Sequence, residues 1–166
     1  MPLDATRTDL SLAVVGTGVM GRGIAQIAAQ AGIRVMLYDT RSEAAPAARD
    51  HVAQMISRLA EKSRLAPDAA KAAIGRIEIA NVLEHLEPCD VVVEAIVEEL
   101  EAKRELFGHL EGIVSPQCVL ATNTSSLQVT AIAATCKRPD RVAGFHFFNP
   151  VPLMKVVEVI DGVMTA

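Results

Sequence analysis

The chain has 166 residues, a net charge of −4 at neutral pH and a hydrophobic content of 51%. A chain of this length and composition is expected to fold as one globular domain with its own core, which excludes a disordered protein. It carries no basic block or stripe, so nucleic acid is not an expected partner. No apolar run reaches the roughly 18 residues that a membrane-spanning helix needs, so no membrane partner is expected either.

The three cysteines, Cys89, Cys118 and Cys136, lie far apart and form no Cys-x-x-Cys motif. This spacing favours buried free thiols over a zinc site or a disulfide framework, and no metal is expected. Residues 1–5 lack the basic segment and the apolar run of a secretory signal peptide. Together these features predict a cytoplasmic protein.

Short apolar runs predict seven strands, which cover residues 10–15, 35–38, 76–80, 90–96, 118–122, 142–147 and 154–160. Apolar residues at helical spacing predict helices at residues 19–31, 40–64, 67–74, 98–114 and 127–135. The long second helix is expected to start at a capping box formed by residues 40–43. The alternation of strands and helices predicts the α/β class, as a Rossmann-type, doubly wound, mostly parallel sheet with helices on both faces.

A glycine-rich turn joins the first predicted strand to the first predicted helix. Gly16, Gly18 and Gly21 form the pattern G-x-G-x-x-G, in which Val19 and Met20 precede the last glycine. The first glycine permits the tight turn, the second lets a pyrophosphate approach the backbone, and the third allows the helix to pack closely on the strand. The helix N-terminus then presents free N–H groups and its positive dipole end to the phosphates. The turn therefore predicts a dinucleotide-binding site that includes all five residues.

Asp39 ends the second predicted strand, 18 positions beyond Gly21. A carboxylate at this point can accept hydrogen bonds from both hydroxyls of an adenosine ribose and would repel a 2′-phosphate, which favours NAD over NADP. Arg41 weakens this preference slightly, because a nearby arginine can accommodate a 2′-phosphate. In the alternative interpretation, the glycines only form a turn and Asp39 only starts the following helix.

A glutamate and a histidine interrupt the apolar strands near the C-terminus. Glu158 lies inside the apolar run 156–160, and His146 lies near the end of the preceding strand. A buried carboxylate without a partner is costly, so Glu158 is expected to hold one imidazole nitrogen of His146 if the strands are neighbours. The other nitrogen could then exchange a proton with a substrate hydroxyl, as an alcohol dehydrogenase without a metal requires. A surface-facing Glu158 and a structural core histidine are the alternative, and the residues alone do not decide between the two.

Two further polar groups follow the fifth and the fourth predicted strands. Residues 123–126 (Asn-Thr-Ser-Ser) could hold a nicotinamide or a substrate oxygen, because ligands of open α/β sheets bind beyond the carboxyl ends of the strands. Capping of the next helix by one of these hydroxyl side chains explains the segment equally well. After the fourth strand come Glu94, Glu98 and Lys103. The lysine could neutralise an anionic ligand, or all three could be solvated helix charges.

These segments together resemble the N-terminal domain of the short-chain 3-hydroxyacyl-CoA dehydrogenase family, which includes bacterial 3-hydroxybutyryl-CoA dehydrogenases. The resemblance rests on residues 14–25, 92–98, 121–127 and 146–158, and it covers nearly the whole chain. Residues 146–158 (HFFNPVPLMKVVE) are far more specific than the glycine turn.

The resemblance implies oxidation of an (S)-3-hydroxyacyl-CoA to a 3-ketoacyl-CoA, with hydride passing to NAD, as in β-oxidation and other acyl-CoA metabolism. It implies His146 as the general base and Glu158 as its orienting partner. It also implies that Ser125 and Asn149 contact the substrate oxygen and support its developing charge. Four further residues are implied as cofactor contacts, namely Asp39, Glu98, Lys103 and Asn123.

Members of this family continue into a helical C-terminal domain that forms a homodimer, closes over the substrate and adds an asparagine to the substrate site. This chain ends at Ala166, where that domain should begin, so residues 1–166 are expected to be the NAD-binding domain alone. We therefore expect the isolated chain to bind NAD but to show negligible turnover.

Two other functions compete with this one. The chain could be an NAD-binding module without activity of its own, or it could belong to the related β-hydroxyacid dehydrogenases. The latter family uses a catalytic lysine, and the segment from His146 to Glu158 argues against it. The acyl-chain preference, the pathway and the oligomeric state of the chain do not follow from the sequence.

Overall fold

The computed structural model describes residues 3–166, so the first two residues of the segment considered for a signal peptide lie outside it. The described strands are β1 (Ser11–Val15), β2 (Arg34–Tyr38), β3 (Ile77–Ile79), β4 (Val91–Glu94), β5 (Val119–Thr122), β6 (Val142–Phe147) and β7 (Val157–Asp161). The described α-helices are α1 (Val19–Gln30), α2 (Ala44–Glu61), α3 (Pro67–Gly75), α4 (Leu100–Ile113) and α5 (Val129–Ala133). Two short 3-10 helices, η1 (Leu83–Leu86) and η2 (Pro139–Arg141), complete the set.

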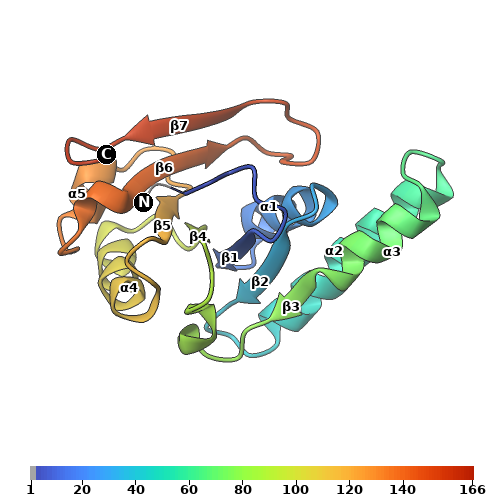
Figure 1. Cartoon of the computed structure of the whole chain (residues 1–166), viewed down its shortest axis with the longest axis horizontal. Coiled ribbons are helices and arrows are strands. Elements are labelled where there is room, and N and C mark those ends of the chain that lie inside the picture. The colour runs from blue at the N-terminus through green and yellow to red at the C-terminus, as the bar shows by residue number, and fades with distance from the viewer. Residues whose placement is uncertain (1–2) are drawn as a thin grey trace.

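The strands form one sheet in the order β3-β2-β1-β4-β5-β6-β7 (Figure 1). Every neighbouring pair is parallel except β6 and β7, which run antiparallel. The strand order reverses between β1 and β4, so the connections that follow these strands leave the sheet in opposite directions and open a crevice at their carboxyl ends. The predicted Rossmann-type, doubly wound sheet is therefore confirmed.

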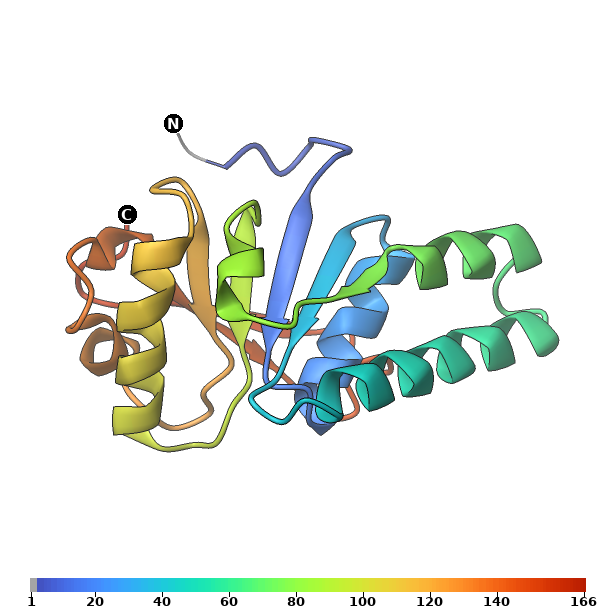
Figure 2. The same cartoon turned by 90° about the horizontal axis from the view of Figure 1, so that it is seen from below.

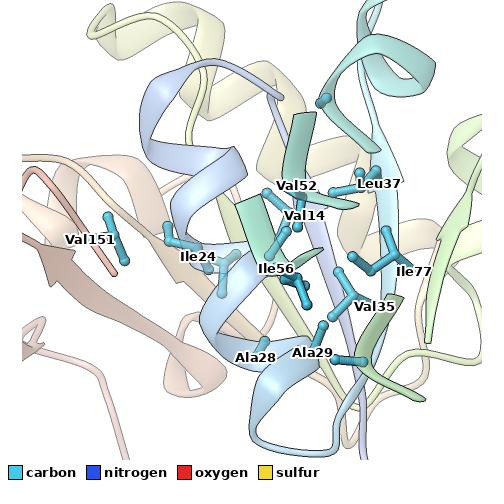
Figure 3. Close-up of a cluster of buried hydrophobic side chains, with 14 of the residues drawn as sticks. Val14, Ile24, Ala28, Ala29, Val35, Leu37, Val52, Ile56, Ile77 and Val151 are labelled. Atoms are coloured by element: carbon cyan, nitrogen blue, oxygen red, sulfur yellow. The ribbon is translucent and has the colours of Figure 1, made fainter. Parts of the chain in front are cut away.

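Alternate residues of β1 enter two separate hydrophobic cores. Val14 faces one side of the sheet, where it packs in a cluster with Ile24 of α1 and Val52 of α2 (Figure 3). Val15 faces the other side and belongs to a cluster that includes Phe107 of α4. Strand β1, an inner strand of the sheet, is therefore buried on both faces, as its continuous apolar run predicts.

The helices α2 and α3 lie side by side and extend beyond the sheet as a helical hairpin (Figures 1 and 2). The capping box predicted for α2 is absent: Glu43 is the N-cap residue, and no side chain among the described residues caps the helix. The backbone supplies the first bond instead, because the N–H of Ala44 donates to the carbonyl of Arg41 at 3.0 Å. Pro46, in the first turn, has no N–H to satisfy.

Strand β7 begins at Val157, later than the sequence predicts. Leu153 and Met154 donate their N–H groups to the carbonyl of Pro150, at 2.9 and 3.1 Å, so this part of the connection is a turn. β7 is the edge of the sheet, and all five of its residues are exposed. The prediction of a buried Glu158 is therefore wrong, since 54% of this side chain is exposed.

The three cysteines are buried free thiols, as predicted. Burial raises the pKa of Cys89 to about 11 and that of Cys118 to about 12, so both thiols stay protonated at neutral pH. None of the helices in residues 3–166 is long and apolar enough to span a membrane.

Candidate active site

A crevice opens at the carboxyl ends of β1 and β4, and it contains two adjoining hollows that are both lined by Ile96. The larger hollow, of about 650 Å³, is lined by the glycine turn, by Asp39 at the end of β2 and by residues of α4. The smaller one, of about 360 Å³, is lined by Met20 of α1 and by polar residues that follow β5 and β6. The residues predicted from separate parts of the sequence thus gather in one region.

The fold itself requires glycine at positions 16 and 21. Gly16 has a φ of +93°, and a Cβ atom there would lie 2.6 Å from the carbonyl oxygen of Ala95. A Cβ atom on Gly21 would collide with the carbonyl oxygen of Gly16, so α1 could not pack against the turn. Neither glycine needs a ligand to explain it.

Gly18 differs from these two glycines. A Cβ atom on Gly18 would meet no described atom within 4 Å, and its φ of −67° is accessible to any residue. Gly18 is the N-cap residue of α1, and no described side chain caps this helix, so its first N–H groups face open space. Free space beside a set of N–H donors is what the pyrophosphate of a dinucleotide requires. The residues present therefore fit a dinucleotide.

Asp39 is held beside the larger hollow by its neighbours. Its Oδ2 atom accepts hydrogen bonds from the N–H of Thr17 at 2.9 Å and from the Thr17 hydroxyl at 2.8 Å. Its Oδ1 atom accepts one from the N–H of Arg41 at 3.1 Å. Burial raises the pKa of Asp39, but these hydrogen bonds outweigh it and hold the pKa below its usual value. Asp39 is thus a fixed carboxylate, as the predicted ribose acceptor must be, and its bond to the Thr17 side chain is not visible in the sequence pattern.

His146 of β6 and Glu158 of β7 lie opposite each other in the antiparallel pair. The Oε2 atom of Glu158 lies 2.8 Å from the Nδ1 atom of His146. A carboxylate in this position accepts a hydrogen bond from the Nδ1–H group, and the neutral imidazole then has a free lone pair on Nε2. Phe148 packs against the imidazole with ring centroids 4.6 Å apart. The predicted pairing of the two residues is present, although Glu158 approaches from an exposed edge strand.

The smaller hollow brings His146 together with Asn123, Ser125 and Asn149. The Oδ1 atom of Asn123 accepts a hydrogen bond from the N–H of Phe147 at 2.9 Å, which leaves its Nδ2 group free to donate. This bond ties the segment after β5 to the end of β6. The hollow thus assembles the residues that the sequence assigns to substrate and cofactor, while their individual roles stay predictions.

One carboxylate oxygen of Glu98 accepts several hydrogen bonds from the segment that follows β5. Its Oε1 atom accepts hydrogen bonds from the Thr124 hydroxyl, from the N–H of Ser125 at 2.9 Å and from the N–H of Ser126 at 3.2 Å. Burial raises the pKa of Glu98, but these bonds and the charge of Lys103 lower it to about 2. The Thr124 hydroxyl also accepts a hydrogen bond from the N–H of Leu127 at 3.0 Å, as a capping side chain would, although α5 itself begins only at Val129.

Lys103 of α4 is buried, with 1% of its side chain exposed. Its Nζ atom lies 2.6 Å from Oε1 of Glu94 and 3.3 Å from Oε2 of Glu98. The interpretation of these charges as solvated is therefore wrong, because Lys103 lies on the inner face of α4, one turn before Phe107. The helical spacing of Lys103, Phe107 and Leu110 carries this signal in the sequence. Lys103 also lines the smaller hollow, but two carboxylates already engage its ammonium group.

The fold and the glycine turn define a dinucleotide-binding domain of the Rossmann type. Residues 11–166 match the family model described as "3-hydroxyacyl-CoA dehydrogenase, NAD binding domain". The chain belongs to this family, and the prediction of NAD as the cofactor is confirmed.

Individual relatives of the chain are named as dehydrogenases of the same family. The chain is 49% identical over 153 residues to a probable 3-hydroxybutyryl-CoA dehydrogenase of Bacillus subtilis, which covers 92% of this chain and 53% of the relative. It is 43% identical over 156 residues to the 3-hydroxyadipyl-CoA dehydrogenase of Escherichia coli, which covers 94% of this chain and 33% of the relative. The crystal structure of 3-hydroxybutyryl-CoA dehydrogenase from Escherichia coli K12 superposes with a TM-score of 0.93 at 42% identity, over 95% of this chain and 34% of that one. The chain thus spans about half or less of the length of these relatives.

Proposed function

We propose that this chain provides the NAD-binding domain and the catalytic base of a 3-hydroxyacyl-CoA dehydrogenase. The observation that carries the proposal is the 2.8 Å contact between Nδ1 of His146 and Glu158, made inside a hollow that adjoins the glycine turn. A dinucleotide site alone would serve many reactions. A histidine with one nitrogen held by a carboxylate and the other open to the hollow is suited to removing a proton from an alcohol.

The residues of this chain divide the proposed chemistry between them. The Glu158 carboxylate accepts a hydrogen bond from the Nδ1–H group of His146, so Nε2 is the basic nitrogen. Nε2 then takes the proton of the substrate 3-hydroxyl. Ser125 and Asn149 donate to the same oxygen and stabilise the negative charge that grows on it as its proton leaves. NAD, when bound, supplies the acceptor for the hydride that leaves C3 of the substrate. In the reverse direction, His146 returns its proton to the ketone oxygen.

The proposed substrate is the CoA thioester of a short 3-hydroxy acid. The relatives support this class, since one is named as a probable 3-hydroxybutyryl-CoA dehydrogenase and another as a 3-hydroxyadipyl-CoA dehydrogenase. The acyl groups in these two names differ in length and in charge, so they support the class of substrate and no single acyl chain. The helical domain and the homodimer that the resemblance implies stay predictions.

A chimera tests the proposal directly. Residues 1–166 replace the matching N-terminal part of the Bacillus subtilis relative, and the consumption of NADH with acetoacetyl-CoA is followed. We expect turnover in the chimera, and binding of NAD by residues 1–166 alone in isothermal titration calorimetry with negligible turnover. A folded chimera that binds NAD but does not reduce acetoacetyl-CoA would contradict the proposal and favour a binding module.

A further inference from the structure

The most deeply buried charges of the domain lie beside the smaller hollow, at the end of β4. Glu94 has no exposed surface, and its carboxylate accepts three hydrogen bonds within the described chain. The donors are the N–H of Ile96 at 2.7 Å, the ammonium of Lys103 at 2.6 Å and the hydroxyl of Thr122 at 2.7 Å. These donors belong to the β4–α4 connection, to α4 and to β5. Glu94 is therefore fixed from three sides.

Lys103 joins this fixed carboxylate to a second one. Its ammonium group carries three N–H donors, and Glu94 and Glu98 lie 2.6 and 3.3 Å from it. An ammonium that is 99% buried is stable only with close anionic partners, so Glu94 fixes Lys103, and Lys103 in turn attracts the Oε2 atom of Glu98.

Glu98 links Lys103 to the segment that contains Ser125. Its Oε2 atom faces Lys103, while its Oε1 atom binds the N–H groups of Ser125 and Ser126 and the hydroxyl of Thr124. These residues follow β5, and Ser125 lines the smaller hollow. The position of Ser125 therefore depends on a side chain of the β4–α4 connection.

We propose that Glu94 and Lys103 are positioning residues, which act through Glu98 to hold the 124–126 segment and the Ser125 side chain at the smaller hollow. This role is additional to the contact with NAD that the family resemblance implies for Lys103. The proposed benefit to catalysis rests on the proposed function, because it assumes that Ser125 meets the substrate oxygen. The geometric part of the proposal does not depend on any activity.

The test compares three variants of the 166-residue chain: Glu94→Gln, Lys103→Met and the double variant. Lys71→Met, an exposed lysine of α3, is the matched control. Hydrogen exchange at the amides of Ser125 and Ser126 is measured by NMR, and NAD affinity is measured by calorimetry. We expect each single variant to lower the protection of these two amides about tenfold, since hydrogen bonds to a well-placed carboxylate are lost. The double variant should lower the protection no further than the more affected single variant, because both residues act through the same series of contacts.

The NAD affinities separate positioning from direct contact. Glu94 is fully buried and does not line the hollow, so Glu94→Gln weakens NAD binding only if Glu94 acts by positioning other residues. Unchanged NAD affinity in Glu94→Gln overturns the proposal. Undiminished amide protection at Ser125 and Ser126 in Lys103→Met overturns it as well.

A variant that keeps donors at position 103 guards against a failure to fold. Lys103→Gln removes the charge but retains hydrogen-bond donors, and the same loss of protection is expected in it. Both measurements are made without substrate, so a failure of this proposal is distinguishable from a chimera that lacks turnover.

Discussion

Two pairs of a basic side chain and a glutamate occur in this domain at nearly the same separation. His146 and Glu158 lie 2.8 Å apart across the exposed edge of the sheet, whereas Lys103 and Glu94 lie 2.6 Å apart in its interior. The Glu158 side chain is 54% exposed and the Glu94 side chain is fully buried. Water competes with the first pair, so losing one partner costs little stability, but it cannot reach a charge left alone in the second. A pair that exchanges protons needs access to its ligand, and a pair that fixes a shape needs exclusion of water.

Two glycines of the glycine turn show the same contrast between a closed and an open position, without charges. Gly21 is closed in by the carbonyl of Gly16, while Gly18 opens onto free space. The fold requires Gly21, whereas Gly18 leaves open the space that we assign to the cofactor. Four experiments can break or sharpen the distinction between closed and open positions.

The largest effect is expected at the exposed pair, on activity alone. His146→Gln in the chimera removes the base and should lower turnover by about 10³-fold, within the range that general-base catalysis contributes. NAD affinity and the free energy of unfolding should stay close to those of the parent chimera, because the Glu158 carboxylate that loses its partner is exposed on the edge strand. Steady-state kinetics and calorimetry check both parts. Equal turnover in the variant would remove His146 from the mechanism.

The buried pair should show the opposite pattern, with a large effect on stability. Lys103→Met leaves Glu94 buried without its cation, and this should lower the free energy of unfolding by about 3–5 kcal/mol. Adding Glu94→Gln should recover much of that loss, because no unpaired charge then remains. Denaturant unfolding of residues 1–166 measures both values, with Lys71→Met as the control. A loss below about 1 kcal/mol in the single variant would mean that water reaches the pair.

The open glycine should affect the ligand and spare the fold. Gly18→Ala places a methyl group where the pyrophosphate should approach, and it should weaken NAD binding by at least about tenfold. The free energy of unfolding should change by less than about 1 kcal/mol, the scale of an exchange at an N-cap position. Gly108→Ala is the matched control, because a Cβ atom on Gly108 also meets no described atom within 4 Å but lies away from the turn. Unchanged NAD affinity in Gly18→Ala would refute the assignment of the open space to the cofactor.

The smallest effect concerns the acid stability of the segment held by Glu98. The pKa of Glu98 is lowered from 4.5 to about 2 in the folded chain, so its carboxylate stabilises the fold above pH 4.5. This contribution is lost as the pH falls from 4.5 through 2. We expect about 1 kcal/mol, because more than a third of the side chain is exposed and solvent screens its partners. Glu98→Gln should flatten the stability curve between these pH values, and an unchanged curve would contradict the assignment.

The sequence predicts all the strands and α-helices of this fold, because apolar periodicity reports which faces are buried. It also predicts the glycine turn and Asp39, whereas the residues alone leave the pairing of His146 with Glu158 undecided and the family resemblance favours it. It does not predict the exposure of Glu158, since an apolar strand at an edge has the same local pattern as a buried one. It misses the pairing of Lys103 with Glu94, because a charged side chain is expected to be exposed to solvent unless its partner is known. That partner, Glu94, lies on β4, whereas Lys103 lies on α4. The contact of Thr17 with Asp39 is equally invisible, as it depends on how β1 and β2 are aligned.

The antiparallel pairing of β6 and β7 makes the exposed part of the intervening connection, residues 152–156, exchangeable. The ladder places His146 opposite Glu158, so residues 152–156 can change as long as that register is kept, whereas Asn149 belongs to the proposed site and Val151 to the core. Residues 150–153 of this connection line a groove of about 330 Å³ with residues of α1 and α2. Residues 152–156 of relatives that act on other acyl-CoA substrates could therefore be grafted here to reshape this wall while His146 and Glu158 stay in place. The proposed base and this adaptable surface thus lie on separate stretches of one hairpin.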